Sequence, residues 1–155
     1  MSGLTLAATL SALHLLALAL GLVSLRGRGL ALAGPLDAEG RNQVLRHDNA
    51  WGLAAVLWIG TGLARAFGGV EKGADFYMGS GAFHLKMGLM AVVLALEAWP
   101  MITFLRWRVA IARGQTPDTR HAATFLWINH AEGVLVVAMI FVASFMARGF
   151  GMLPR

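Results

Sequence analysis

The sequence contains no cysteine. Disulfide bonds, thiolate metal sites, iron–sulfur clusters and a cysteine nucleophile are therefore all excluded. Charged residues are also scarce, at 14% of 155 residues, whereas hydrophobic residues make up 57%. Soluble domains contain about 25% charged residues, and one core of this size cannot hide so much apolar surface from water. The composition indicates that lipid solvates part of the chain.

The formal net charge of +5 does not predict a nucleic-acid partner. Basic residues that bind nucleic acid lie along one face or groove, interleaved with aromatic residues. Here the basic residues gather at the ends of long apolar runs instead. The lipid bilayer is therefore the expected partner, and nucleic acid is not.

Four long apolar runs predict four membrane-spanning helices, because about 20 apolar residues cross a bilayer core of about 30 Å. The runs cover residues 4–25, 49–67, 83–105 and 122–147. The connections between them, 26–48, 68–82 and 106–121, are too short to hold a second domain. We therefore expect an all-α integral membrane four-helix bundle in a single domain, residues 1–155.

Basic residues are concentrated on one side of these spans. The first and third connections carry Arg26, Arg28, Arg41, Arg46, Arg106, Arg108, Arg113 and Arg120. The opposite side carries Lys72, Arg148 and Arg155, with Arg65 near a helix end. Connections rich in arginine stay in the cytoplasm. We therefore expect both termini on the non-cytoplasmic side of a multi-pass protein.

Residues near the span ends are expected to anchor the protein in the headgroup region. Trp58 lies deeper in its span, whereas the other tryptophans lie near predicted ends, namely Trp51, Trp99, Trp107 and Trp127. An indole ring prefers the membrane–water interface at such positions. Arg26 and Arg28 follow the first span, where we expect them to bind lipid phosphate or a ligand's carboxylates.

Ionisable side chains within the spans are the candidates for chemistry, because each costs several kcal/mol unless it has a partner or faces a cavity. They are His14, Lys86, Glu97, His130 and Glu132. His14 is surrounded by leucine and alanine, which favours a role as metal ligand or proton carrier. The alternative is a histidine that hydrogen-bonds to a carbonyl or to a Ser or Thr hydroxyl on a neighbouring helix.

Lys86 and Glu97 lie on nearly the same face of one helix, but about 16 Å apart along it. They cannot pair directly, and each is a candidate catalytic residue. Lys86 would orient an anionic group or relay protons. The alternatives are that Lys86 extends to the interface and that Glu97 makes an interhelical hydrogen bond.

His130 and Glu132 are two residues apart and point to different helix faces, so they do not form a two-ligand metal motif. A haem with two histidine ligands would pair His14 with His130. A haem with His14 as its single histidine ligand, and a weak or empty sixth position, is equally allowed.

The order of motifs along the chain resembles a bacterial family of four-helix membrane proteins of unknown function, and the resemblance covers nearly the whole chain. It rests on the first-span histidine and on the segments RHDNAWGLA at 46–54, GLAR at 62–65, EKG at 71–73, FY at 76–77 and FHLKMGL at 83–89. The resemblance implies a bacterial inner (cytoplasmic) membrane and brings no activity with it.

More distantly, the layout is similar to the HemJ-type protoporphyrinogen oxidases. His14 and Lys86 match that family's first-span histidine and the lysine that opens a later span. This resemblance implies that His14 binds haem b and that Lys86 belongs to the site. One departure is that residues 22–30 read LVSLRGRGL, where that family has a Leu-Pro-Arg-Leu-like segment.

Two function classes follow from these observations. The first is a haem-b membrane redox protein that oxidises a porphyrinogen or a quinol, so that its partners would be haem, a porphyrin or a quinone. His14 and His130 would bind the cofactor, and Lys86 and Glu97 would be the catalytic residues. The alternative is a non-enzymatic subunit that packs in a homo-oligomer or a larger membrane complex.

Overall fold

The computed structural model describes residues 3–152, which fold into four long helices and one short helix. The helices are α1 (Gly3–Ala33), α2 (Ala38–Phe67), α3 (Ala74–Met78), α4 (Gly81–Ala112) and α5 (Ala122–Ala147). All of them except α3 are long and apolar enough to cross a membrane. The predicted all-α, four-span architecture is confirmed. Arg155, used above to predict the orientation, lies outside the described residues.

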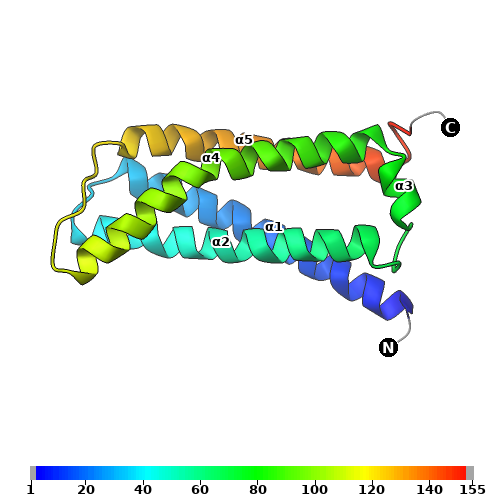
Figure 1. The fold of residues 1–155 in the computed structure, drawn as a ribbon, viewed down its shortest axis with the longest axis horizontal. Helices are drawn as coiled ribbons and strands as arrows, with labels where there is room; N and C mark the ends of the chain where they lie inside the picture. The colour runs from blue at the N-terminus through cyan, green and yellow to red at the C-terminus, as the bar shows by residue number, and fades with distance from the viewer. Residues whose placement is uncertain (1–2, 153–155) are drawn as a thin grey trace.

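The long helices pack as two antiparallel pairs, α1 with α2 and α4 with α5 (Figure 1). The short helix α3 lies at the end of the bundle where α1 begins and α5 ends. Near that end α1 diverges from the other helices, and its first turns project beyond them.

The predicted connection at residues 26–48 is wrong, because nearly all of it is helical. α1 continues to Ala33 and α2 begins at Ala38. Asp37 caps α2 by accepting a hydrogen bond from the backbone N–H of Gly40 at 2.9 Å. The polar composition suggested a loop, but the charge of Arg28 is neutralised inside the bundle, so the helix can continue through it.

Helix α4 continues through Pro100, which is buried. Proline cannot donate the helical hydrogen bond and its ring crowds the preceding turn. Figure 1 accordingly shows α4 changing direction partway along its length. Its N-terminus is capped by Ser80, whose hydroxyl accepts a hydrogen bond from the N–H of Phe83.

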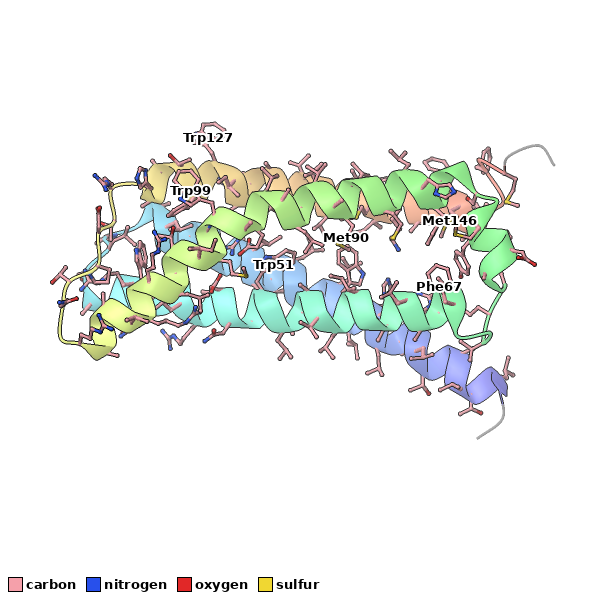
Figure 2. The ribbon with its side chains drawn as sticks, in the orientation of Figure 1. Trp51, Phe67, Met90, Trp99, Trp127 and Met146 are labelled. Carbon is pink, nitrogen blue, oxygen red and sulfur yellow. The ribbon has the colours of Figure 1, made fainter. Side chains whose placement is uncertain are left out.

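The prediction that most tryptophans are interfacial anchors holds for only part of the set. Trp99 and Trp127 are exposed on the outer surface (Figure 2), as an anchor requires. Trp51 and Trp107 are instead buried in the core. The indole N–H of Trp51 donates to the carboxylate of Glu97, which explains its inward position.

An apolar cluster fills the middle of the bundle. It contains Ala17, Leu25, Trp51, Trp58, Val93, Val136 and Met139. On α1, Ala17 and Leu25 fall between His14 and Arg28 in sequence, and Val93 falls likewise between Lys86 and Glu97 on α4. The polar residues are therefore divided into two groups, one on each side of this cluster.

Candidate functional site

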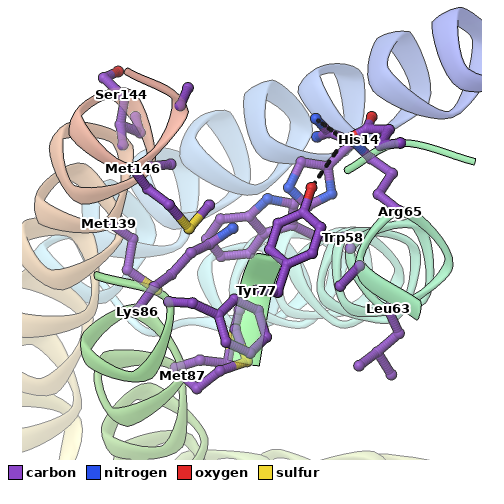
Figure 3. Close-up of a pocket in the computed structure, with 18 of the residues that line it drawn as sticks. His14, Trp58, Leu63, Arg65, Tyr77, Lys86, Met87, Met139, Ser144 and Met146 are labelled. Atoms are coloured by element: carbon purple, nitrogen blue, oxygen red, sulfur yellow. Dashed lines mark hydrogen bonds and ion pairs between the residues drawn. The ribbon is translucent and has the colours of Figure 1, made fainter. Parts of the chain in front are cut away.

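A cavity of about 510 Å³ lies at the end of the bundle that carries α3, and residues of all five helices line it (Figure 3). Pockets for small molecules and cofactors span roughly 300–1,000 Å³. Most of the lining is apolar or aromatic, including Trp58, Tyr77 and Phe83. The polar groups that converge on it include His14, Arg65 and Lys86. This combination is typical of a ligand site.

His14 enters the cavity from α1 and is held by a hydrogen bond to α2. Its Nδ1 lies 2.9 Å from Oγ1 of Thr61, and the Thr61 hydroxyl donates its proton to the carbonyl of Leu57 at 2.6 Å. When the hydroxyl proton is used in this bond to Leu57, the hydroxyl oxygen accepts from the histidine and the neutral ring carries its proton on Nδ1. Nε2 is left with a free lone pair, which is the form that binds a metal.

Lys86 enters the same cavity from α4, so the structure brings together His14 and Lys86, which are far apart in sequence (Figure 3). Within residues 3–152 its ammonium has no hydrogen-bond or ion-pair partner. A second polar group without a partner there is the buried indole N–H of Trp58, whose ring centroid is 5.8 Å from that of His14. The cavity therefore offers a cation and an imidazole, and the indole N–H of Trp58 is buried beside it.

The segment between α2 and α4 is fastened at the cavity by Glu71. The guanidinium of Arg65 donates to both oxygens of this carboxylate, at 2.7 and 3.3 Å. The Tyr77 hydroxyl donates to it at 3.0 Å and the Ser11 hydroxyl at 3.1 Å. Three helices, α1, α2 and α3, are thereby joined to one carboxylate.

The protonation states of Glu71 and Tyr77 follow from their contacts. Burial alone would raise the pKa of Glu71, but the hydrogen bonds from Arg65, Tyr77 and Ser11 outweigh it and hold that pKa below its usual range. Burial and the neighbouring Glu71 carboxylate both raise the pKa of Tyr77, to about 12. Glu71 is therefore ionised and Tyr77 protonated at neutral pH.

A second polar group lies beyond the apolar cluster and is centred on Arg28, whose side chain is 1% exposed. Its Nη1 donates to Glu97 at 2.8 Å and to Asp48 at 3.2 Å. Its Nη2 donates to Glu97 at 2.9 Å and to Glu132 at 2.6 Å. Its Nε donates to Asn129 at 2.8 Å. We call these residues the Arg28 cluster.

The family model for predicted membrane proteins DUF2214 matches residues 6–151 of the chain. The chain belongs to the DUF2214 family. No curated protein and no solved structure matches it. Membership in DUF2214 confirms the predicted family of four-helix membrane proteins, and the similarity to the HemJ-type oxidases stays a hypothesis.

For this DUF2214 protein, the pairing of His14 with His130 on one haem is wrong. Asn129, beside His130, hydrogen-bonds to the carbonyl of Leu25, and Leu25 is about 16 Å along α1 from His14. The His130 side chain is exposed on the outer surface, with its ring centroid 6.4 Å from that of Trp127. One helical position rotates a side chain by about 100°, which turns His130 away from the bundle.

Glu97 also lies outside the cavity of this DUF2214 protein. Both its oxygens accept from Arg28, and one also accepts from Trp51. Its predicted alternative, an interhelical hydrogen bond, is what the structure shows. Glu97 and Lys86 therefore serve different sites, and Glu97 does not contact anything bound beside His14.

Arg28 is the residue that the sequence interpretation missed. The prediction that it binds lipid phosphate at the interface is wrong, because its guanidinium is buried among carboxylates. The sequence did contain a signal, namely two glutamates within the spans that have no cation near them along the chain. Glu97 and Glu132 lie within predicted spans and require a cation, and Lys86, on the same helix as Glu97, is too far from it to supply one.

The cavity of this DUF2214 protein contains residues that could hold haem b. His14 offers an iron ligand whose other ring nitrogen is held by Thr61, as histidine ligands require. Four methionines line the same cavity, Met87, Met90, Met139 and Met146, and a thioether is a known second haem ligand. The apolar and aromatic side chains of the walls could pack against the macrocycle, and the ammonium of Lys86 could pair with a carboxylate substituent of the haem.

Proposed function

We propose that this protein is a haem-b-binding membrane redox protein in which His14 is the axial ligand. The observation that carries the proposal is the convergence of His14 and Lys86 on one cavity, with Nδ1 of His14 held by Thr61. An imidazole lone pair beside an unpartnered cation fits a cofactor that carries both a metal and carboxylates. Bound haem would supply one-electron redox chemistry.

The role of Thr61 in this proposal is to position His14. Its hydroxyl accepts from Nδ1 while donating to the Leu57 carbonyl, so the orientation of the ring is fixed from within α2. Gly62 leaves room for the ring beside α2, because a Cβ at that position would lie 3.1 Å from Cε1 of His14. The chain therefore supplies the ligand in one tautomer and one orientation.

Lys86 would bind the polar edge of the cofactor or substrate. Its ammonium lacks a partner in the described part of the chain, and the residue lines the cavity. A carboxylate or a quinone carbonyl is an acceptor that satisfies this donor. A porphyrinogen and a quinol are the substrate classes that match this apolar cavity with few donors.

We propose a bacterial inner membrane location with the cavity toward the non-cytoplasmic side. Arg28 is removed from the charge count because it is neutralised inside the bundle. The remaining arginines of the first and third connections still outnumber the basic residues at the α3 end. The positive-inside rule therefore still places the α3 end outside the cytoplasm.

Pyridine haemochrome analysis of the detergent-purified protein tests the proposal. We expect near-stoichiometric haem b in the wild type and in His130→Ala, whose histidine is exposed away from the cavity. We expect His14→Ala to be inserted and folded but to lose the haem. Folded wild-type protein without haem, whether purified from membranes or reconstituted with haem b, would overturn the proposal and favour a structural membrane subunit.

A further inference from the structure

The Arg28 cluster contains more negative than positive groups. Its carboxylates come from three helices, with Asp48 on α2, Glu97 on α4 and Glu132 on α5. Two cations contact these carboxylates, Arg28 and the neighbouring Arg108, which donates to Asp48 at 2.7 Å. With every group ionised, two positive charges face three negative charges. The cluster would therefore carry a net charge of −1 inside the bundle.

The hydrogen-bond donors of Arg28 are all used. Five N–H groups are available on a guanidinium, and five contacts are made, to Asn129, Asp48, Glu132 and twice to Glu97. The guanidinium therefore has no donor left for a further carboxylate oxygen, and any remaining oxygen needs its partner from another source.

Glu132 has such an oxygen. Its side chain is fully buried, and its Oε1 has no hydrogen-bond partner within the described residues. The carboxyl groups of Glu132 and Glu97 are also neighbours, because both accept from Nη2 of Arg28. A hydrogen bond between two carboxyl groups requires a proton on one of them. One added proton would both make that bond and bring the net charge of the cluster to zero.

We propose that the Arg28 cluster is an intramembrane proton-binding site in which Glu132 and Glu97 hold one proton between them. The groups that face this pair from the packed helices are Arg28 from α1, Asp48 and the indole of Trp51 from α2, and Arg108 from α4. A protonatable carboxyl group inside a membrane span is typical of proton relays.

This site is separate from the cavity of the proposed haem. Glu132 on α5 and Glu97 on α4 lie on the far side of the apolar cluster from His14 and Lys86. The Arg28 cluster and the cavity share no residue. The proton site does not depend on haem, and the protein can be tested with or without a cofactor.

Infrared spectroscopy of the detergent-purified protein tests the proposal directly. A protonated carboxylic acid has a carbonyl stretch that a carboxylate lacks, and it shifts in D₂O. We expect this band at about pH 7, where a glutamic acid in water is ionised. Glu132→Gln should remove it. Glu39→Gln, at an exposed ion pair with Arg46, is the matched control and should retain it.

Glu97→Gln gives an independent test if Glu132→Gln does not fold. Neutralising Glu97 leaves two cations and two carboxylates, so no proton is needed and the band should again be lost. The proposal is overturned if the wild type has no such band at about pH 7, or if both variants keep it at full intensity. Stabilisation by sodium ions without the band would also overturn it and assign the site to a metal cation.

Discussion

Arg28 and Glu97 form a bidentate ion pair inside the bundle, with Nη1···Oε1 at 2.8 Å and Nη2···Oε2 at 2.9 Å. The two residues come from α1 and α4, which belong to different helix pairs. A parallel pair of charge-assisted hydrogen bonds fixes both distance and angle between its partners. This contact therefore sets the register between the α1–α2 pair and the α4–α5 pair.

Replacing Arg28 with methionine should destabilise the protein severely. The substitution leaves three buried carboxylates without their common donor, and removing one partner of a buried ion pair costs about 3–5 kcal/mol. Thermal unfolding in detergent, followed by circular dichroism, measures the loss. Arg26→Met is the control, because Arg26 is exposed two positions away. Equal melting temperatures for the two variants would contradict the role given to the Arg28 cluster.

Gly29→Ala should destabilise the protein through Asn129. A Cβ at Gly29 would lie 2.9 Å from Nδ2 of Asn129, and this nitrogen also donates to the carbonyl of Leu25. Overpacking of this kind costs about 1–3 kcal/mol. Gly60→Ala is the matched control, because a Cβ there meets no atom within 4 Å. We expect a lower melting temperature for Gly29→Ala only, and a stable Gly29→Ala protein would contradict the packing described.

Tyr77 is the only tyrosine in the sequence, so its ionisation can be read from the absorbance of the whole protein. Because its pKa is raised to about 12, the midpoint should lie well above the usual value of about 10. A raised pKa stabilises the folded state fully below about pH 10, and that contribution is lost as the pH rises through 12.

Glu71→Gln provides the comparison for this titration, because it removes the carboxylate that opposes ionisation of Tyr77. The midpoint should fall toward the usual value, while burial keeps it from falling fully. The pKa of Glu71 is lowered, so its own stabilisation is present above the unfolded value of about 4.3 and is lost as the pH falls through the folded value. An unchanged Tyr77 midpoint in Glu71→Gln would refute the contact.

Lys86→Met should weaken haem binding without affecting insertion. Methionine keeps much of the length and apolar character of the side chain but removes the cation proposed to hold a carboxylate. Arg46→Met is the control, because Arg46 does not line the cavity and is exposed in an ion pair with Glu39. We expect a dissociation constant for haem b roughly tenfold higher for Lys86→Met only. Equal affinities would leave Lys86 as a residue that extends to the interface.

The spans could be predicted from sequence because hydrophobicity along the chain reports directly on lipid contact. Helix α5 covers the range expected for the fourth span, Ala122–Ala147. The first connection was mispredicted because local composition does not reveal that a charge is neutralised by residues far away in the sequence. The segment around Arg28 is polar in sequence, and its carboxylate partners Glu97 and Glu132 lie 69 and 104 positions away.

The sequence could predict which residues are candidates for a site, but not which of them lie together. His14 and Lys86 could be identified from sequence because an ionisable side chain within a span is a functional candidate whatever its neighbours are. Which groups meet depends on helix packing, and this separated Glu97 and His130 from the cavity. Trp58 and the tautomer of His14 could not be predicted, because both depend on hydrogen bonds across helices.

Imidazole rescue of a His14→Gly variant tests the central claim most directly, because it distinguishes an iron ligand from a structural histidine. The apoprotein would be titrated with haem b, and oxidised-minus-reduced spectra recorded with and without imidazole. We predict that wild type binds haem, that His14→Gly does not, and that imidazole restores the wild-type spectrum. A His14→Gly protein that binds haem with the wild-type spectrum in the absence of imidazole would contradict the account.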